Sequence, residues 1–251
     1  DGVFPSILWR DTQNYPIFSI RTPDGEESKE LKDGSGILKV GDYNVFYSRD
    51  VSSKGTVMFR FGFSEKDSGS VEGTWTINVR TDKKLELQGY VVDVSQGWDG
   101  NSRWNSNRIS EVYTVTFPST ADSCISTGAY TVNFPFFPGD KIGDRSSYSG
   151  KGPLIDGRLG VDITAPGHFT FSTATGNAYE FFSGTSSAAP HVVGAAALLL
   201  QYDMTIDNTK FKQIIYSSAT VDKFTGAVPN NMWGYGKLNI EGALKKYING
   251  M

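Results

Sequence analysis

Cysteine is almost absent from this sequence. Its 251 residues include one, Cys124, which excludes a disulfide within the chain. The cellular compartment stays open, because many secreted bacterial proteins also lack cysteine pairs. Cys124 lies in the run 123–130, which we expect to form a buried strand with the thiol as a small core side chain.

Long runs of one charge and long apolar runs are also missing. The chain has 24 basic and 27 acidic residues, interspersed, and this balance argues against a nucleic-acid or polybasic membrane surface. The longest apolar segment, which ends at Leu200, is too short and too rich in alanine to span a bilayer. No initiating Met or signal peptide is present at residues 1–5, and we expect a fragment of a longer protein.

Aromatic residues and glycine are plentiful. An aromatic content of 13% with 28 glycines suits a β-rich, turn-rich protein better than a helical bundle. Residues 1–117 contain short runs with period-two alternation, separated by turn sequences, which predict an antiparallel sandwich or jelly-roll domain. The predicted strands are 17–21, 43–47, 56–63, 73–80, 85–92 and 112–116.

Tryptophan and arginine in this domain allow a second interpretation, a carbohydrate-stacking surface. The residues concerned are Trp9, Trp75, Trp98, Arg103, Trp104 and Arg108. We favour core packing for Trp75, whose neighbours alternate with it as polar residues, and edge capping for the tryptophans at 98 and 104. Asp93, Asp99 and Asn101 carry oxygen ligands without a regular spacing, so no metal site is assigned.

Residues 118–251 have a different texture. A strand at 123–130 is followed by a Gly/Ser-rich loop at 144–153 and a strand-to-loop unit at 161–167. Residues 208–219 place Phe211, Ile214 and Ile215 on one face of an amphipathic helix, and a last helix follows the glycine-rich turn within 233–244. Strands alternating with helices predict an α/β domain.

The stretch 181–200 organises this second domain. A Gly-Thr-Ser turn leads into an alanine-rich segment that is apolar on every face, which predicts a buried central helix. Gly184 permits unusual backbone angles, Pro190 is expected in the first turn, and Gly194 is expected to allow close packing. Ser186 then lies at the helix N-terminus, where free N–H groups stabilise developing negative charge. Taken alone, the tripeptide favours a helix cap over a catalytic serine.

The longer run Gly184-Thr-Ser-Ser-Ala-Ala-Pro-His-Val-Val-Gly194 resembles the catalytic-serine segment of the subtilisin-like serine proteases, the subtilases of peptidase family S8. Further resemblances occur in family order. They are Ile125-Ser-Thr-Gly-Ala-Tyr130 with I-T-V-G-A, Tyr148-Ser-Gly-Lys-Gly-Pro153 with S-S-x-G-P, Asp162-Ile-Thr-Ala-Pro-Gly167 with D-I-x-A-P-G, and Gly234-Tyr-Gly-Lys-Leu-Asn239 with G-x-G-x-V-N. Residues 72–77 and 116–121 are similar, more weakly, to a jelly-roll domain inserted in some bacterial subtilases, the clostridial Csp type among them.

The resemblance implies the C-terminal part of a parallel-sheet subtilisin-like fold and a serine endopeptidase that acts through an acyl-enzyme on Ser186. It implies that Phe182, Ser183, Gly184 and Thr185 line the substrate cleft, although Phe181 and Phe182 equally fit inward-packed strand positions. The expected partner is a protein or peptide substrate, with no nucleic acid and no membrane. No cofactor or metal ligand is assigned, a structural calcium ion is left open, and the expected location is secreted or in the cell envelope.

The family's aspartate motif, its H-G-T-H histidine motif and its oxyanion asparagine are missing from this chain, and Asn177 follows the A-P-G turn in the wrong order. Of the two histidines, we expect His191 to be a packed, hydrogen-bonded core residue and His168 a surface loop residue. Position 187 holds serine where the family usually has methionine. The chain alone is therefore expected to be inactive, and its partner to be the missing N-terminal part of the same protease or a second chain.

Two other functions stay open. One is a non-catalytic binding or scaffolding module whose sandwich recognises a protein or glycan. The other is an unrelated esterase, which is disfavoured because Ala188 breaks the G-x-S-x-G pattern.

Overall fold

The computed structural model describes residues 3–65, 70–93, 102–133 and 140–249. Its chain divides into two compact units, Asp1–Ile109 and Ser110–Met251, which are described separately here. This division lies eight residues before the start expected for the second domain, since 118 − 110 = 8.

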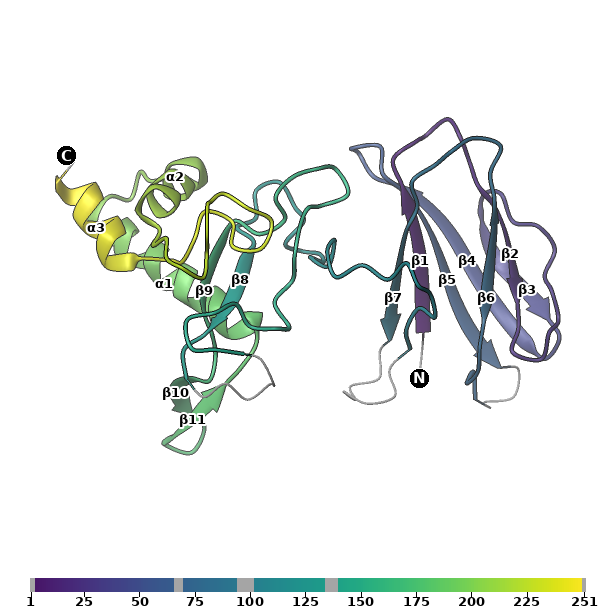
Figure 1. Ribbon diagram of the computed structural model, residues 1–251, viewed down its shortest axis with the longest axis horizontal. Helices are drawn as coiled ribbons and strands as arrows, with labels where there is room; N and C mark the ends of the chain where they lie inside the picture. The colour runs from purple at the N-terminus through teal and green to yellow at the C-terminus, as the bar shows by residue number, and fades with distance from the viewer. Residues whose placement is uncertain (1–2, 66–69, 94–101, 134–139, 250–251) are drawn as a thin grey trace. The chain divides into compact units, whose positions relative to one another are not determined.

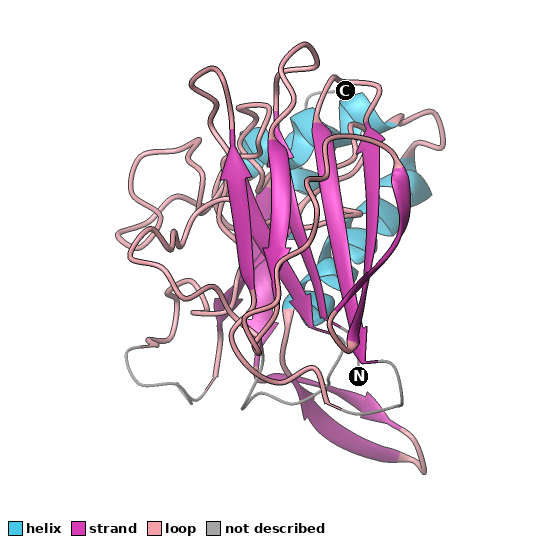
Figure 2. Ribbon diagram, turned by 90° about the vertical axis from the view of Figure 1, so that its right-hand side faces the viewer, coloured by secondary structure: helices cyan, strands magenta, loops and turns pink. Residues whose placement is uncertain are grey.

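The first unit contains two antiparallel sheets (Figure 1). The larger has the strand order β3-β4-β5-β1-β7 and the smaller pairs β2 with β6. The strands are β1 (Val3–Trp9), β2 (Ile17–Arg21), β3 (Ser35–Val40), β4 (Tyr43–Val51), β5 (Val57–Glu65), β6 (Thr76–Arg80) and β7 (Gln88–Asp93). All helices drawn in cyan in Figure 2 belong to the second unit.

One aromatic core joins the two sheets of this unit. Phe18 of β2 packs against Phe59 and Phe61 of β5, at ring-centroid distances of 4.7 and 5.7 Å. Buried Val57, Phe59 and Phe61 alternate along β5 with the less buried Met58 and Arg60, which is the period expected of a strand with one face on a core. The two antiparallel sheets of this unit therefore share one core.

The tryptophans mostly serve this core. Trp9 is 1% exposed, and Trp75 stacks on Phe63 at 4.1 Å. Trp104 packs against the same cluster, whereas Trp98 lies outside the described residues. The carbohydrate-stacking interpretation is therefore wrong for Trp9 and Trp75, whose rings are committed to packing.

Several strand predictions need correction. Residues 112–116 form no strand, while β1 and β3 were not predicted. β1 lacks period-two burial, because Pro5, Ser6 and Ile7 are all buried in succession where the strand lies between β5 and β7. The predicted strand at 17–21 is confirmed with the same bounds. Four further predicted strands are confirmed with shifted ends, namely 43–47, 56–63, 73–80 and 85–92.

The second unit is built on two parallel strands, β8 (Thr127–Thr131) and β9 (Ile163–His168). Helix α1 (Thr185–Tyr202) packs against both, and α2 (Asn208–Ser218) packs against α3 (Ile240–Asn249). A hairpin of β10 (Thr170–Ala174) and β11 (Ala178–Phe182) connects β9 to α1 (Figure 1). The α/β prediction is thus confirmed, and α2 buries Phe211, Ile214 and Ile215 as expected.

Helix α1 differs from its prediction. Ser187, Ala188, Val192, Ala195 and Leu199 form one buried stripe, whereas Val193 is 67% and Leu198 41% exposed. No layer of the described residues covers that second face, so an apolar composition does not bury the whole helix here. A Cβ added at Gly194 would meet nothing within 4 Å outside the helix's own backbone, so this glycine serves no close packing.

Smaller corrections concern the entry to β8 and the start of α1. Cys124 precedes β8 in a loop and is partly buried, with its carbonyl accepting a hydrogen bond from Lys212 Nζ at 2.7 Å. Pro190 is the sixth residue of α1, in its second turn. Its missing N–H leaves the Ser186 carbonyl without the usual i+4 donor.

The closing segment runs beside β9. Tyr235 N donates to Asp162 O at 2.8 Å, and Leu238 N donates to Thr164 O at 2.7 Å. Gly234 has φ 57°, and a Cβ there would lie 2.1 Å from Asp162 O, so only glycine fits. This segment holds β9 on the side away from β8.

Candidate nucleophile site

Ser186 is the second residue of α1 and is exposed. The residue that caps this helix is Gly184, with φ 139° and ψ 163° and no side chain to satisfy the first N–H groups. An L-residue rarely adopts such angles, so the prediction of unusual backbone at Gly184 is confirmed. The chain reaches Ser186 directly from the hairpin, through a turn only glycine accommodates.

The hydrogen bonds of the first turn leave one backbone donor free at the serine. Gly184 O accepts hydrogen bonds from Ser187 N at 2.9 Å and Ala188 N at 3.4 Å, which begins the helical ladder. Among the described residues, Ser186 N–H has no recorded acceptor and Ser186 Oγ no recorded partner. A free N–H in the first turn, with the helix dipole behind it, can stabilise an oxyanion that forms when the serine hydroxyl attacks a carbonyl group.

The other sequence-predicted cleft residues surround this turn. Phe182 ends β11 with 54% of its surface exposed, and Phe181 is 47% exposed, so neither packs inward. Ser183 Oγ instead accepts a hydrogen bond from Phe169 N at 3.0 Å, bracing the start of the hairpin, where Phe169 has φ 54°. Thr185 is the first residue of α1 and partly buried.

Neither histidine is placed to activate Ser186. His191 Nδ1 lies 3.0 Å from Ser187 O on the same helix, so the nitrogen donates to that carbonyl; the expected hydrogen bond is confirmed, although the ring is only partly buried. His168 was expected in a surface loop, but it ends β9 and is 2% exposed. That prediction was wrong because β9 continues through the A-P-G sequence instead of turning there.

Ser187 occupies the buried side of the helix start. It is 5% exposed and shares a short hydrogen bond with the hydroxyl of Thr170 on β10. The bond ties the hairpin to the first turn of α1. Ser187 therefore has a structural role beside Ser186.

The described residues contain no group of three or more His, Cys, Asp or Glu that could hold a metal ion. Asp99 and Asn101 lie outside the described residues, as does the side chain of Asp93 at the end of β7. Within the same described ranges, no helix has the length and apolarity needed to cross a bilayer.

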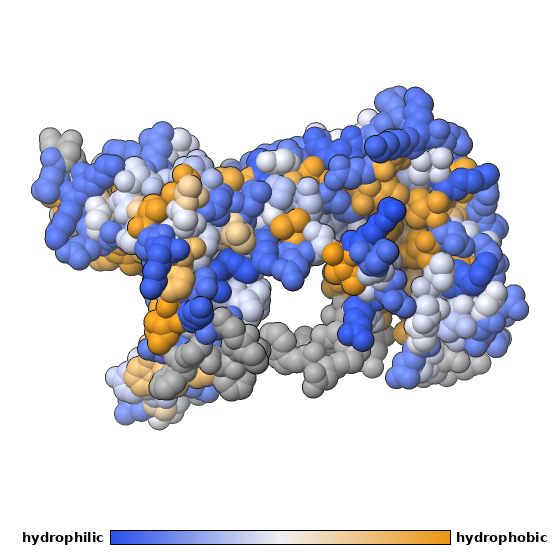
Figure 3. All heavy atoms as spheres, in the orientation of Figure 1, coloured by the Kyte–Doolittle hydropathy of each residue, from blue (hydrophilic) through white to orange (hydrophobic). Residues whose placement is uncertain are grey.

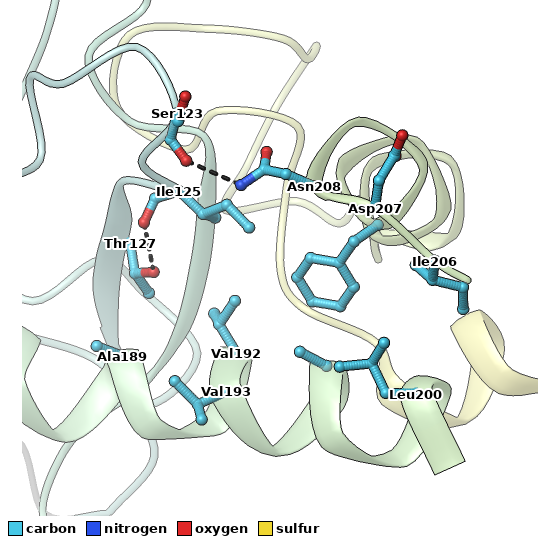
Figure 4. Close-up of a pocket in the computed structure, with 12 residues that line it drawn as sticks. Ser123, Ile125, Thr127, Ala189, Val192, Val193, Leu200, Ile206, Asp207 and Asn208 are labelled. Atoms are coloured by element: carbon cyan, nitrogen blue, oxygen red, sulfur yellow. Dashed lines mark hydrogen bonds between the residues drawn. The ribbon is translucent and has the colours of Figure 1, made fainter. Parts of the chain in front are cut away.

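An apolar groove of about 370 Å³ lies between the chain entering β8 and helices α1 and α2 (Figure 4). Ile125 and Val192 point into it, and Val193 and Phe211 also line it. At its rim, Asn208 Nδ2 donates to Ser123 O at 2.9 Å. Sequence reasoning missed this groove, because its residues come from three separate segments.

The β10–β11 hairpin carries a second apolar surface that the sequence did not predict. Phe171 stacks on Tyr179 at 5.4 Å and meets Phe181 at 5.1 Å, while Phe171 and Tyr179 are 60% and 66% exposed. Figure 3 shows apolar surface on and above this hairpin. These aromatic residues meet because of the cross-strand register, in which Phe171 pairs with Phe181. The sequence alone does not show that register.

Comparison with known proteins identifies the family of this chain. The model of the subtilase family matches residues 67–236. A subtilisin of Bacillus pumilus is 30% identical over 175 residues, covering 70% of this chain and 54% of that protein. Subtilisin E of Bacillus subtilis is 31% identical over 177 residues, covering 70% of this chain and 39% of that protein.

The Clostridium perfringens CspB protease has a similar structure, with a TM-score of 0.76 at 21% identity. The likeness covers 99% of this chain and 52% of that one, and therefore shows the fold of both units. This chain spans about half the length, or less, of the curated subtilisins it matches. By the extent of the family match, the chain belongs to the subtilases.

Proposed function

We propose that this chain is part of a serine endopeptidase in which Ser186 is the nucleophile. The observation that carries the proposal is the exposed Ser186 in the first turn of α1, beside its own free N–H. Ser186 Oγ attacks the peptide carbonyl and gives its proton to a base, while the carbonyl oxygen becomes an oxyanion stabilised by that N–H. The amine then leaves with a proton, and water releases the acyl group.

The base, its carboxylate and a side-chain oxyanion donor come from the part of the protease that this chain does not include, or from a second chain. Two observations support this. The relatives are much longer than the matched region. The two-stranded parallel sheet and the apolar groove beside it also leave hydrophobic surface such as Val193 exposed, which a further layer would cover.

Phe182, Ser183, Gly184 and Thr185 line the leaving-group side of the substrate cleft in this proposal. Phe182 offers exposed aromatic surface directly before the turn. Ser183 and Thr185 contribute their backbone positions, since the hydroxyl of Ser183 is used by Phe169. We expect an apolar preference at the substrate residue that contacts Phe182.

The first unit is proposed to be an inserted jelly-roll domain, with the domains divided as 1–117 and 118–251. Its antiparallel sheets and self-contained aromatic core support an independent module. As in the bacterial subtilisins it resembles, the enzyme is proposed to act outside the cytoplasm, with no cofactor required for the reaction.

The test is cleavage of a denatured protein by the full-length protease that contains this chain. The wild type should degrade casein, and Ser186→Ala should lower the rate by at least about 1,000-fold because no nucleophile remains. Substitution of the buried neighbour, Ser187→Ala, should keep most of the activity. Equal rates for wild type and Ser186→Ala would refute the proposal.

One observation favours a second candidate, a non-catalytic module that binds a protein or glycan: among the described residues, no histidine or carboxylate contacts Ser186. A full-length protein that lacks the family's aspartate and histidine motifs, and leaves casein intact, would select this alternative.

A further inference from the structure

Tyr148 lies in the loop between β8 and β9, in the sequence Tyr148-Ser-Gly-Lys-Gly-Pro153, and its hydroxyl reaches the turn before Ser186. The hydroxyl donates to Gly167 O at 2.7 Å and accepts from Gly184 N at 3.1 Å. Gly184 N also donates to Gly167 O at 2.7 Å, so three groups form a closed set of hydrogen bonds. The last residues of β9 and the cap of α1 are therefore joined both directly and through one phenol oxygen.

The number of hydrogens on each group determines which atom donates in each of these hydrogen bonds. A phenol has one hydrogen, and a carbonyl can only accept, so the hydrogen of Tyr148 points to Gly167 O. The oxygen then accepts from Gly184 N–H, and from His168 Nδ1, which lies 3.3 Å away on buried β9. Burial raises the pKa of Tyr148 above its ordinary value, which keeps the hydroxyl protonated at neutral pH.

Hydrogen bonds consequently hold both backbone polar groups of Gly184, its N–H and its carbonyl. Its N–H is held by Tyr148 and Gly167, and its carbonyl by the N–H groups of Ser187 and Ala188. The backbone of Gly184 is in a region with φ 139° that glycine enters freely but has no intrinsic reason to keep. Ser186 is two residues further on, so loosening of this turn moves the serine and its N–H together.

We propose that Tyr148 is a positioning residue for Ser186, acting through the Gly184 turn. This inference rests on the proposed function and deepens it. The hydroxyl selects one orientation of the turn, in which Ser186 Oγ and the Ser186 N–H both face the incoming carbonyl. Positioning of this kind acts on the chemical step, because a shift of about 1 Å at a reacting atom costs rate while substrate binding is nearly kept.

The experiment is Tyr148→Phe in the full-length protease, which removes one oxygen and keeps the ring. We expect kcat for a peptide amide substrate to fall about 10- to 100-fold with KM within about twofold of wild type. The amide of Gly184 should exchange its hydrogen about tenfold faster, since one of its two acceptors is lost.

Tyr247→Phe is the matched control. It removes the hydroxyl of a partly buried tyrosine that donates to Asp203 Oδ2 between α3 and the end of α1. Both variants should lower the melting temperature by a few degrees, about 2–5 °C, but Tyr247→Phe should leave kcat unchanged. This separates positioning from a general loss of stability.

The outcomes separate the two proposals. Faster exchange at Gly184 with an unchanged kcat would overturn the positioning role, as would equal losses of kcat in both variants. A wild-type enzyme that cleaves nothing would overturn the proposed function, and the positioning role with it. In that case, exchange at Gly184 in Tyr148→Phe would still show whether the hydroxyl holds the turn.

Discussion

At the scale of single residues, Gly184 is required by its backbone and not by lack of space. A Cβ built on it would come no closer than 3.6 Å to Ser186 N, so an alanine meets no clash. Its φ of 139° is nonetheless outside the range of ordinary L-residues. Any substitution must therefore change the backbone that delivers Ser186.

In the full-length protease, Gly184→Ala should destabilise the protein by about 1 kcal/mol or more. It should also slow the reaction of Ser186 with a fluorophosphonate at least about tenfold. Urea denaturation measures the free energy of unfolding, and the time course of fluorophosphonate labelling measures the rate at Ser186. Gly194→Ala is the control in the same helix, where nothing lies within 4 Å of the added methyl. This variant should stabilise the protein by about 0.5–1 kcal/mol and keep the labelling rate of Ser186. Equal stability changes and equal labelling rates in the two variants would contradict the account.

The sequence predicted the helix start at Ser186 and the unusual backbone of Gly184, because both depend on local geometry. It failed for His168, whose burial depends on β9 continuing through Pro166 and on packing by Phe169 at 4.9 Å. It also missed Tyr148, which meets Gly184 only because a loop folds over β9. Long-range contacts of this kind leave no local pattern.

At the scale of elements, Lys237 fastens the closing segment to the strands. Its side chain is 9% exposed and pairs with Asp222 at 2.6 Å and with the carbonyl of Gly143. Three aromatic rings, those of Tyr130, Phe224 and Trp233, surround the ammonium group at 5.0–5.2 Å. This buried cation, with two oxygen acceptors and three aromatic neighbours, links the closing segment to the residues that follow β8 and α2.

Lys237→Met should destabilise the protein by about 2 kcal/mol, because it removes the cation and leaves Asp222 without its partner. The control, Lys245→Met, breaks the exposed pair with Glu241 and should leave the midpoint of denaturation unchanged. Equal midpoints for the two variants in urea would show that the Lys237 contacts contribute nothing.

Tyr216 of α2 gives a prediction in alkali. It stacks on Tyr235 at 4.1 Å, and burial, reinforced by the negative charge of Asp162, raises its pKa. The folded state therefore binds more protons than the unfolded state once the pH exceeds the ordinary value of about 10, and stability falls as the pH rises further. Tyr216→Phe should reduce this fall between about pH 9 and about pH 11 in pH-dependent urea titrations; an unchanged slope would contradict it.

Elements with one buried face were predictable, as α2 and β2 show. The β10–β11 hairpin was not, because all five residues of β11 are exposed and no alternation of burial marks it. The composition of α1 suggested burial on all sides, yet only one stripe has neighbours among the described residues. Composition reports what a helix can bury, and its surroundings decide what it does bury.

At the scale of the whole molecule, the two units differ in how complete they are. The first encloses Phe18, Phe59 and Phe61 between its own sheets. The second leaves an apolar groove and the Val193 face of α1 open. We expect residues 1–109 to unfold cooperatively on their own in a thermal scan, and a non-cooperative transition would contradict their independence.

The measurement that tests the central claim most directly is fluorophosphonate labelling located by peptide mass spectrometry. The account predicts a single adduct at Ser186 in the full-length protease and none in this 251-residue chain alone, which lacks the base. Robust labelling of Ser186 in the isolated chain, or no labelling of Ser186 in the full-length protease, would contradict it.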